Sequence, residues 1–227
     1  MVRDALLRSA PHQEAARVCV VSLAMSLQSR VSPFGDLFAA AVRGTLMGNR
    51  GGRLHDDHRK LTTRRWTSKQ WICCRLDFNN RRRTVWGDGY TELFFLDEVT
   101  AFAAGHRPCF ECRRKDAARF ASLFPGAPAD GRATAAVMDK VLHAERLSGK
   151  EKRLHKAAID TLPDGAMIAQ DNAAFALRGP HLLPWTAAGY GPPIARPRGI
   201  DVDVLTPPAI VAVLTRGYVP LLHASAA

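Results

Sequence analysis

The sequence predicts an α+β fold, in which a small mixed sheet with a cysteine knuckle is followed by a helix pair and a second small β-rich region. Three observations support this prediction. Residues 70–78 alternate between two faces, and residues 93–96 form an apolar run that suits a buried strand. Residues 133–147 repeat apolar side chains at helical spacing. Short apolar segments separated by turn residues occupy 166–205 and predict the second β-rich region.

In the N-terminal half, capping residues, glycines and turn residues predict the helices and strands. Asp97 is expected to cap a helix that stops at Gly105, because Asp accepts hydrogen bonds from free helical N–H groups and Gly adopts the left-handed conformation that ends a helix. The remaining expectations, in chain order, are a helix over 1–41, a glycine-rich loop over 43–53, a strand over 70–78 turning at Asn79-Asn80, and a return strand over 81–85.

The C-terminal half predicts two helices, several strands and a last helix. The helices are expected at 133–147 and 150–162, with a break near Ser148-Gly149. Thr206 is expected to cap the last helix, with Pro207 at its first position and Gly217 after its end. The expected strands are 166–169, 173–177, 181–185 and 200–205.

We expect three segments along the chain. Residues 1–42 form an N-terminal segment that carries no motif, and a start at Met25 would leave every motif intact. Residues 43–124 form the cysteine-containing region, and residues 132–227 hold the helix pair and the β-rich C-terminal part. The stretch PGAPADG between the last two is typical of a linker.

Composition narrows the class of protein. An apolar content of 47% is ordinary for a globular chain of 227 residues. No run approaches the roughly 18 apolar residues that a membrane span needs. The five cysteines do not pair off, and four of them lie in two close pairs. This usage favours metal ligation in a reducing compartment over a disulfide framework, so we expect a cytoplasmic protein.

Cys109 and Cys112 are the strongest metal-ligand candidates. Two cysteines separated by two residues can place both sulfurs on one ion, because the turn between them directs both side chains inward. The order Ala103-Ala104-Gly105, Arg107-Pro108-Cys109 and Cys112-Arg113 resembles the N-terminal zinc domain of the Ada alkylation-response proteins. This resemblance implies a structural Zn²⁺ site, a zinc knuckle, in a DNA-associated domain.

The likeness to the Ada domain is confined to residues 94–120. The phrases RGTLMGNRG, YTELFFLDE and DVLTPP also resemble an uncharacterised bacterial family without an assigned activity. The self-methylating cysteine of the Ada domain has no secure counterpart in this chain, so the resemblance does not carry phosphotriester repair with it.

The remaining metal ligands depart from the Ada pattern. The Ada domain has two further cysteines separated by three residues, whereas Cys73 and Cys74 are adjacent here. Adjacent residues on a strand point to opposite faces, so at most one of them is a ligand, and we favour Cys74. Cys74 shares its face with the apolar residues Ile72, Leu76 and Phe78, so we expect this face to contact the core. Histidine is the natural substitute for the fourth, and we favour His55 over His58. The predicted zinc ligands are therefore Cys109, Cys112, Cys74 and His55.

Positive charge is concentrated next to these candidates. The formal net charge is +11, and residues 50–83 hold eleven Arg and Lys against three Asp, a net +8. Such a field attracts polyanions, and we expect nucleic acid, DNA rather than RNA. Trp66 and Trp86 are candidates to stack on bases. The predicted phosphate contacts are Arg64, Arg65, Arg81, Arg82, Arg83, Arg113 and Arg114.

Three functions remain open at this point. We favour a zinc-binding protein that binds nucleic acid through the basic region, an interpretation that requires no catalysis. The first alternative is a metal-dependent, nuclease-like enzyme acting on nucleic acid, which would use His55-Asp56-Asp57-His58 with Glu111 or His143 around an open metal position. The second alternative is a protein-interaction scaffold on which the basic residues only solvate the surface.

Overall fold

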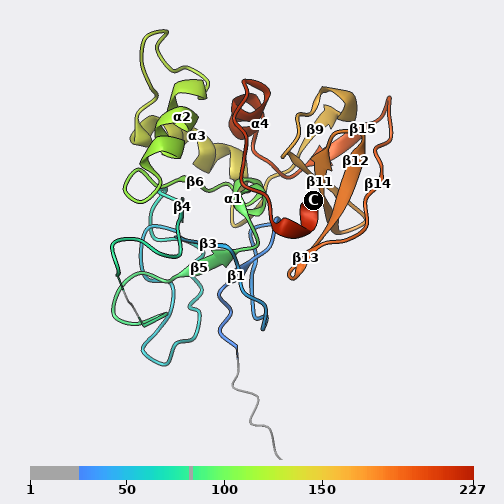
Figure 1. Cartoon of the computed structure of the whole chain (residues 1–227). Helices are drawn as coiled ribbons and strands as arrows, with labels where there is room; N and C mark the ends of the chain where they lie inside the picture. The colour runs from blue at the N-terminus through green and yellow to red at the C-terminus, as the bar shows by residue number, and fades with distance from the viewer. Residues whose placement is uncertain (1–25, 82–83) are drawn as a thin grey trace, which may run out of the picture.

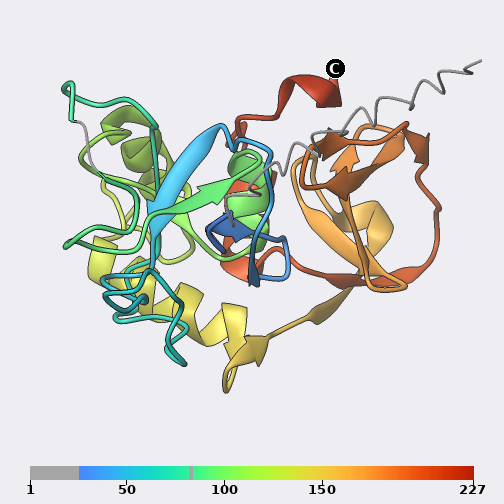
Figure 2. The same cartoon turned by 90° about the horizontal axis from the view of Figure 1, so that it is seen from below.

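The protein is described by a computed structural model that covers residues 26–81 and 84–227. Two sheets pack against one short central helix, α1 (Glu98–Ala103). Figure 1 shows the first sheet below α1 and the second sheet at its right, and Figure 2 shows α1 between them. The α+β class predicted from the sequence is confirmed.

In the described residues the first sheet has six strands in the order β2-β1-β5-β3-β4-β6. It is mixed, since β1 runs parallel to β5 and β4 runs parallel to β6, while the other pairs are antiparallel. The predicted strands at 70–78 and 93–96 both belong to it, as expected. Its strands are β1 (Arg30–Val31), β2 (Leu37–Phe38), β3 (Leu46–Asn49), β4 (Ile72–Cys74), β5 (Leu93–Phe95) and β6 (Arg107–Pro108).

The predicted glycine-rich loop at 43–53 is wrong over its centre, because β3 lies inside it and pairs with both β4 and β5. Gly48 serves packing here. A Cβ at this position would lie 2.2 Å from the Ile72 carbonyl oxygen and 2.7 Å from the Phe95 ring. The absence of a side chain therefore lets the strand sit between its neighbours.

Helix α1 has the ends that its sequence predicts. The Asp97 carboxylate accepts a hydrogen bond from the Thr100 N–H at 2.8 Å. At the other end Gly105 has φ +81°, the Gly105 N–H donates to the Phe102 carbonyl and the His106 N–H donates to the Ala101 carbonyl. These two bonds form a Schellman motif, which turns the chain into β6 and the knuckle. Every residue of α1 is buried.

Three longer helices lie above the first sheet and to the left of the second in Figure 1, namely α2 (Arg114–Leu123), α3 (Ala135–Arg146) and α4 (Pro208–Thr215). The helix expected at 133–147 is α3, and its N-cap Thr134 accepts from the Val137 N–H. Aromatic side chains of α1, α2 and the chain after α4 meet in one core, where Phe102, Phe120 and Tyr218 contact one another. This core joins residues on both sides of the 125–131 stretch. The domain boundaries remain a prediction.

The second sheet has, within the described chain, the order β13-β12-β11-β10-β15-β9, with β14 beside β12. All four strands predicted between 166 and 205 are present in it, and its pairs are antiparallel. Its strands are β9 (His155–Ala158), β10 (Met167–Gln170), β11 (Ala173–Arg178), β12 (His181–Thr186), β13 (Gly189–Tyr190), β14 (Ile194–Ala195) and β15 (Asp201–Val204).

The prediction of a helix at 150–162 is wrong. This segment forms β8 (Glu151–Lys152), which pairs with β7 (Leu147–Ser148), and then β9 and the 3₁₀ turn η1 (Ile159–Thr161). The cause is tertiary pairing, because β9 aligns with β15 over four residues and Lys156 forms an ion pair with Asp203 at 2.9 Å. Apolar residues at helical spacing did not outweigh this edge pairing.

Other local predictions need correction. Residues 30–31 and 37–38 are strands rather than helix, and the rest of the predicted N-terminal helix before residue 26 lies outside the described residues. The turn at Asn79-Asn80 is present with positive φ at both residues, but its described sequel, 81 and 84–85, is not a strand. Thr206 does not cap α4, because its hydroxyl accepts from the Met167 N–H instead.

The described residues include a short 3₁₀ turn near the C-terminus, η2 (Ala224–Ala226), whose Ser225 hydroxyl accepts from the Tyr190 N–H. None of the helices in these residues combines the length and the apolarity needed to cross a membrane.

Candidate metal centre

Strand β4 sends its two adjacent cysteines to opposite faces of the first sheet. Cys73 is fully buried in an apolar cluster with Leu46, Leu93 and Phe95, which packs against α1. Cys74 lies on the other face. The alternation argument therefore holds, but the face that contacts the core is that of Cys73, and not the face of Cys74 as the apolar pattern suggested.

The knuckle is held beside β4 by backbone hydrogen bonds. The Cys109 N–H donates to the Cys73 carbonyl at 3.0 Å, which continues the parallel pairing of β4 with β6. The Arg113 N–H donates to the Cys109 carbonyl at 3.1 Å and closes the turn that leads into α2. The loop between the two cysteines is thereby fixed against the end of β4.

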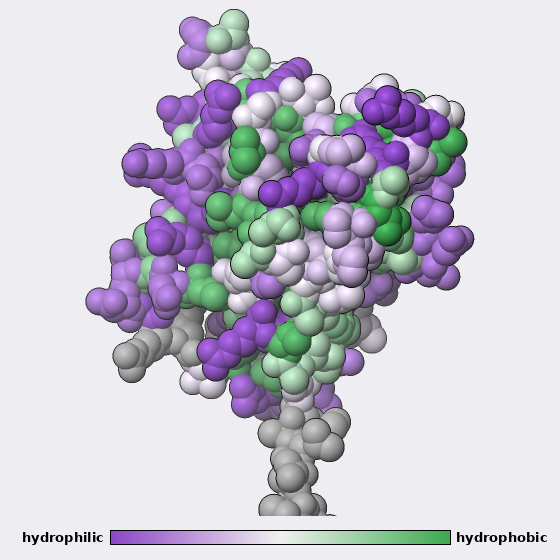
Figure 3. Space-filling model, turned by 45° about the vertical axis from the view of Figure 1, so that its right-hand side comes forward, coloured by the Kyte–Doolittle hydropathy of each residue, from purple (hydrophilic) through white to green (hydrophobic). Residues whose placement is uncertain are grey.

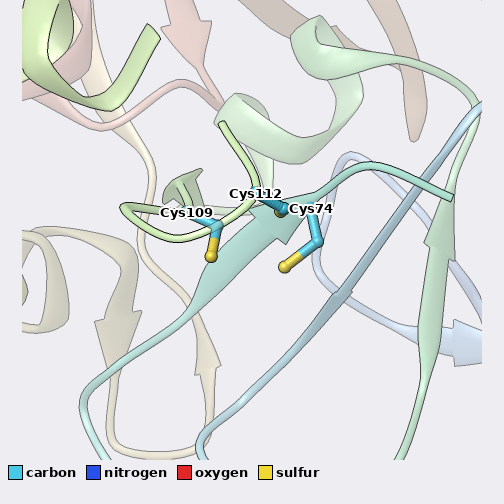
Figure 4. Close-up of side chains that lie close together, drawn as sticks. All are labelled: Cys74, Cys109 and Cys112. Carbon is cyan, nitrogen blue, oxygen red and sulfur yellow. The ribbon is translucent and has the colours of Figure 1, made fainter. Parts of the chain in front are cut away.

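The sulfurs of Cys74, Cys109 and Cys112 all lie within 4.8 Å of one another. Figure 4 shows the Cys74 side chain at the end of β4 and the other two on the adjoining loop, with the Cys74 and Cys109 sulfurs directed to the same side. In a tetrahedral zinc site with Zn–S bonds of about 2.3 Å the sulfurs are about 3.8 Å apart. The cluster therefore fits a metal ion such as zinc, for which soft thiolates are suitable ligands.

Backbone N–H groups stabilise negative charge on two of these sulfurs. The Arg75 N–H donates to Cys112 Sγ and the Glu111 N–H donates to Cys109 Sγ, each at 3.4 Å. The pKa of Cys109 is lowered because the Cys112 and Cys74 thiols donate to its sulfur, and the pKa of Cys74 is raised because its thiol donates to Cys109 and Cys112. Burial raises the pKa of Cys73 and keeps that thiol neutral.

A pocket of about 520 Å³ opens beside the cluster and is lined by all three cysteines. Its remaining lining comes from the sheet face that carries Cys74, from described residues of 75–81 and 84–92, and from Glu111 between the two knuckle cysteines. A second pocket of about 730 Å³ shares Cys112, Arg75, Leu76 and Glu111 with the first. The three sulfurs are therefore reachable from outside, and not enclosed by the fold.

The structure does not bring His55, the predicted fourth ligand, to the three sulfurs. His55 is buried elsewhere, where its Nε2 donates to the Gly87 carbonyl at 3.0 Å and its Nδ1 contacts the Thr91 hydroxyl at 2.7 Å. Its ring also stacks on Trp86 with centroids 5.3 Å apart. Both nitrogens are engaged, so no lone pair is left for a metal. No other His, Cys, Asp or Glu in the described residues joins the cluster.

The residues of the nuclease-like alternative are also dispersed. Asp56 closes a turn by accepting from the His58 and Lys60 N–H groups, and its pKa is lowered chiefly by the Lys60 bond. His143 contacts Arg146 and Trp66. Glu111 alone lines the pocket, and it forms an ion pair with Arg81 at 2.7 Å.

The predicted phosphate contacts that the structure describes divide into three groups. Arg113 is buried and paired with Glu98 at 2.8 Å and Asp116 at 2.9 Å, so this prediction is wrong for Arg113. Arg65 pairs with Asp36 at 3.0 Å, as Arg81 does with Glu111. Arg64 and Arg114 are exposed and form no ion pair with a described residue. Arg82 and Arg83 lie outside the described residues.

Trp86 is buried and donates its indole N–H to the Glu92 carbonyl, which excludes it as a stacking platform for bases. Trp66 is half-buried against Trp71 and His143.

Sequence reasoning missed the pocket face of the first sheet. Met47 lies opposite Cys74 on one side and opposite Phe94 on the other, so the three side chains share one face. The signal was present in the alternation of 70–78, where Cys74 shares a face with Ile72. The sequence did not predict that β3 is a strand. It therefore gave no reason to place Met47 and Phe94 on the same face as Cys74.

Comparison of the chain with protein-family models, with curated proteins and with solved structures finds no match in any of the three.

Proposed function

We propose that the protein binds one zinc ion through Cys74, Cys109 and Cys112 and binds nucleic acid on the surface around that ion. The observation that carries the proposal is the convergence of three sulfurs from two separate segments of the chain. Thiolates gathered in this way repel one another, and a divalent cation neutralises them. Zinc is the common ion for sulfur-rich, four-coordinate sites.

Basic side chains beside the cluster support the second half of the proposal. The second pocket, which Cys112 also lines, has three exposed basic side chains in its wall, namely Arg75, Arg114 and Lys115. None of the three forms an ion pair with a described residue. Arg75 belongs to the 50–83 stretch with its net +8, and Arg114 and Lys115 add to this positive charge, so we expect a positive field beside the cluster. A polyanion would contact these basic side chains through its phosphates. Figure 3 turns the side of the second sheet forward, where hydrophilic side chains surround apolar patches.

The test is a salt titration of fluorescence anisotropy with labelled single- and double-stranded oligonucleotides. We expect binding that weakens steeply as salt rises, because each arginine–phosphate contact releases a counterion. The double variant Arg114→Ala/Lys115→Ala should reduce the slope of log K against log salt by roughly 2. The matched control is Lys140→Ala/Arg178→Ala, which removes the same two kinds of charge from exposed positions outside both pockets.

Two results would contradict the proposal. Absence of binding at about 50 mM salt would favour the scaffold alternative, because several phosphate contacts are easily detected there. Equal losses in the two double variants would mean that the metal face has no special role.

A second candidate function is supported by the number of sulfurs. A closed structural zinc has four protein ligands, whereas a catalytic zinc has three and keeps one position open. With three ligands and a pocket beside them, we infer that a metal-dependent enzyme acting on nucleic acid is the alternative. Incubating zinc-loaded protein with end-labelled oligonucleotides tests it, with Cys109→Ser, which removes a ligand, as the control. Intact oligonucleotides after prolonged incubation would exclude a nuclease.

A further inference from the structure

The pocket beside the cluster has an apolar floor formed by one face of the first sheet. Neighbouring strands place Met47, Ile72, Cys74 and Phe94 on this face, because Met47 is in register with both Cys74 and Phe94. The opposite face packs against α1 through Leu93 and its neighbours. One side of the sheet is thus filled by the core, while the other is open to a ligand.

Described residues of 75–81 and 84–92 form the outer wall of this pocket. They contribute the mainly apolar side chains Leu76, Phe78, Val85 and Tyr90. A volume of about 520 Å³ lies within the range of about 300–1,000 Å³ that is common for small-molecule sites. An aromatic and aliphatic lining of this kind suits a planar ring, which gains contact area by lying flat against Phe94 or Phe78.

Polar groups at the edge of the pocket differ in whether they are already paired. Glu111 pairs with Arg81, and Glu92 accepts from the Trp86 N–H at 2.8 Å. The Arg75 guanidinium forms no ion pair with a described residue. Asn49 accepts from the Gly51 N–H at 2.9 Å with its side-chain oxygen, which leaves its amide nitrogen as a donor. Arg75 and the Asn49 amide are therefore the groups that can hold an anionic part of a ligand. That part has to lie on their side of the pocket, because the Glu92 carboxylate forms no ion pair with a described residue.

The net charge of the metal centre indicates which kind of atom completes its coordination. Three thiolates and one Zn²⁺ carry a net charge of −1, so a neutral donor is favoured over a further anion as the fourth ligand. An aromatic ring nitrogen is neutral and binds zinc well. Since the three cysteines line the pocket, a ligand in the pocket can reach the fourth coordination position of an ion bound by them.

We propose that this pocket takes one nucleotide, with its base against the Met47–Phe94 face, a base nitrogen at the fourth position of the metal, and its phosphate paired with Arg75. The inference rests on the proposed zinc site and specifies what completes it. The nucleotide can be free or can be a unit of a single strand whose base is unstacked, since both present the same three groups.

Cobalt-substituted protein provides the test, because Co²⁺ accepts the same ligands as zinc and its visible absorption bands report changes in coordination. The probes are AMP, adenosine, ribose 5-phosphate and a short oligo(dA). We expect AMP to shift the bands and to bind about tenfold more tightly than adenosine, because a charge-assisted contact to Arg75 is added. Ribose 5-phosphate, which lacks the base, should leave the bands unchanged.

Variants separate the contributions of phosphate and base. Arg75→Ala should bring the affinity for AMP down to that for adenosine, while Arg178→Ala, an exposed arginine on β11, should leave both unchanged. Phe94→Leu, which keeps an apolar side chain, should weaken AMP and adenosine alike by roughly 5-fold or more through lost stacking. Circular dichroism and cobalt stoichiometry establish that each variant is folded and loaded.

The outcomes distinguish this inference from the function on which it rests. A cobalt spectrum that neither millimolar AMP nor oligo(dA) alters overturns the nucleotide pocket, even where oligonucleotides bind the basic surface. Equal affinities of wild type and Arg75→Ala for AMP overturn the assigned phosphate contact. A shift with AMP but not with oligo(dA) identifies a free nucleotide as the ligand, and the reverse identifies a strand. Failure to bind cobalt contradicts the zinc site itself.

Discussion

The two sheets that pack against α1 bury different chemistry. Around the first sheet and the knuckle, charged side chains lie in the interior, among them Arg50, Glu98, Arg107 and Arg113. The second sheet buries almost entirely apolar side chains on longer strands, such as Met167, Leu177 and Leu182. The first region therefore depends on keeping its buried charges partnered, and on the metal that we propose, whereas the second relies on apolar burial.

The Arg113–Glu98 pair shows how the first region depends on long-range polar contacts. Glu98 is fully buried and accepts from Arg113, from the Tyr218 hydroxyl at 2.9 Å and from the Leu221 N–H at 2.9 Å. Arg113 also contacts Cys73 Sγ at 3.6 Å. The carboxylate at the start of α1 thus links the knuckle to the C-terminal segment.

The largest effect is expected for Glu98→Ala. The substitution leaves the Arg113 guanidinium buried with only Asp116 as a partner, which should lower the free energy of unfolding by about 3–5 kcal/mol. Urea denaturation followed by circular dichroism measures it. The control is Asp203→Ala, which breaks the more exposed Lys156–Asp203 pair on the second sheet and should cost less than about 1 kcal/mol. Similar losses in the two variants would contradict the contrast between the sheets.

An apolar truncation in the second sheet should have the next largest effect. Leu177→Ala in β11 removes a side chain that is 1% exposed, and should lower the free energy of unfolding by about 3 kcal/mol through lost burial and the cavity left behind. Zinc stoichiometry by elemental analysis should stay at the wild-type value, because Leu177 pairs with Leu182 within the second sheet and the three cysteines belong to the first sheet and the knuckle. Loss of metal in this variant would show that the two regions do not respond separately.

The smallest effect concerns Lys152, whose ammonium donates to the Ala103 carbonyl at the end of α1. Burial, with help from Arg146, lowers the pKa of Lys152 to about 7. Between about pH 7 and its ordinary pKa near 10.5, the unfolded chain holds a proton that the folded chain has released. The contribution of this residue to the free energy of unfolding therefore rises with pH across that range.

Lys152→Met removes this dependence. The free energy of unfolding of the wild type minus that of the variant should increase by roughly 1 kcal/mol from pH 7 to pH 8, measured by urea denaturation at the two values. Lys140→Met, which changes an exposed lysine of α3, is the control and should show no such trend. Parallel pH profiles for wild type and Lys152→Met would mean that the ammonium is charged in the folded protein.

The parts of the fold that were predictable from the sequence are those with local causes. Asp97 and Gly105 mark the ends of α1 through contacts within a few residues. The alternation of 70–78 separates Cys73 and Cys74 onto opposite faces, but it did not predict which of the two faces the core. The error at 150–162 arose where strand pairing with β15, some 45 residues away, outweighed the local pattern.

The candidate site was predictable only in part for the same reason. Cys109 and Cys112 share one turn, and their spacing alone places them together. The position of His55 depends on Gly87 and Thr91, which are 32 and 36 residues away in the chain, and no local signal reveals that contact. In the sequence, Arg113 looks like the other basic residues that follow the knuckle. Only the position of Glu98 in the fold makes it one half of a buried ion pair.

X-ray absorption at the zinc edge tests the central claim most directly, because it counts the sulfur and the lighter ligands of the bound ion. For purified wild-type protein the account predicts one zinc per chain with three sulfurs at about 2.3 Å and one nitrogen or oxygen at about 2.0–2.1 Å. Cys74→Ser should reduce the sulfur count to two, whereas Cys73→Ser, on the opposite face of β4, should leave it at three. A zinc-free protein, or a wild-type site with no more than two sulfurs, would contradict the account.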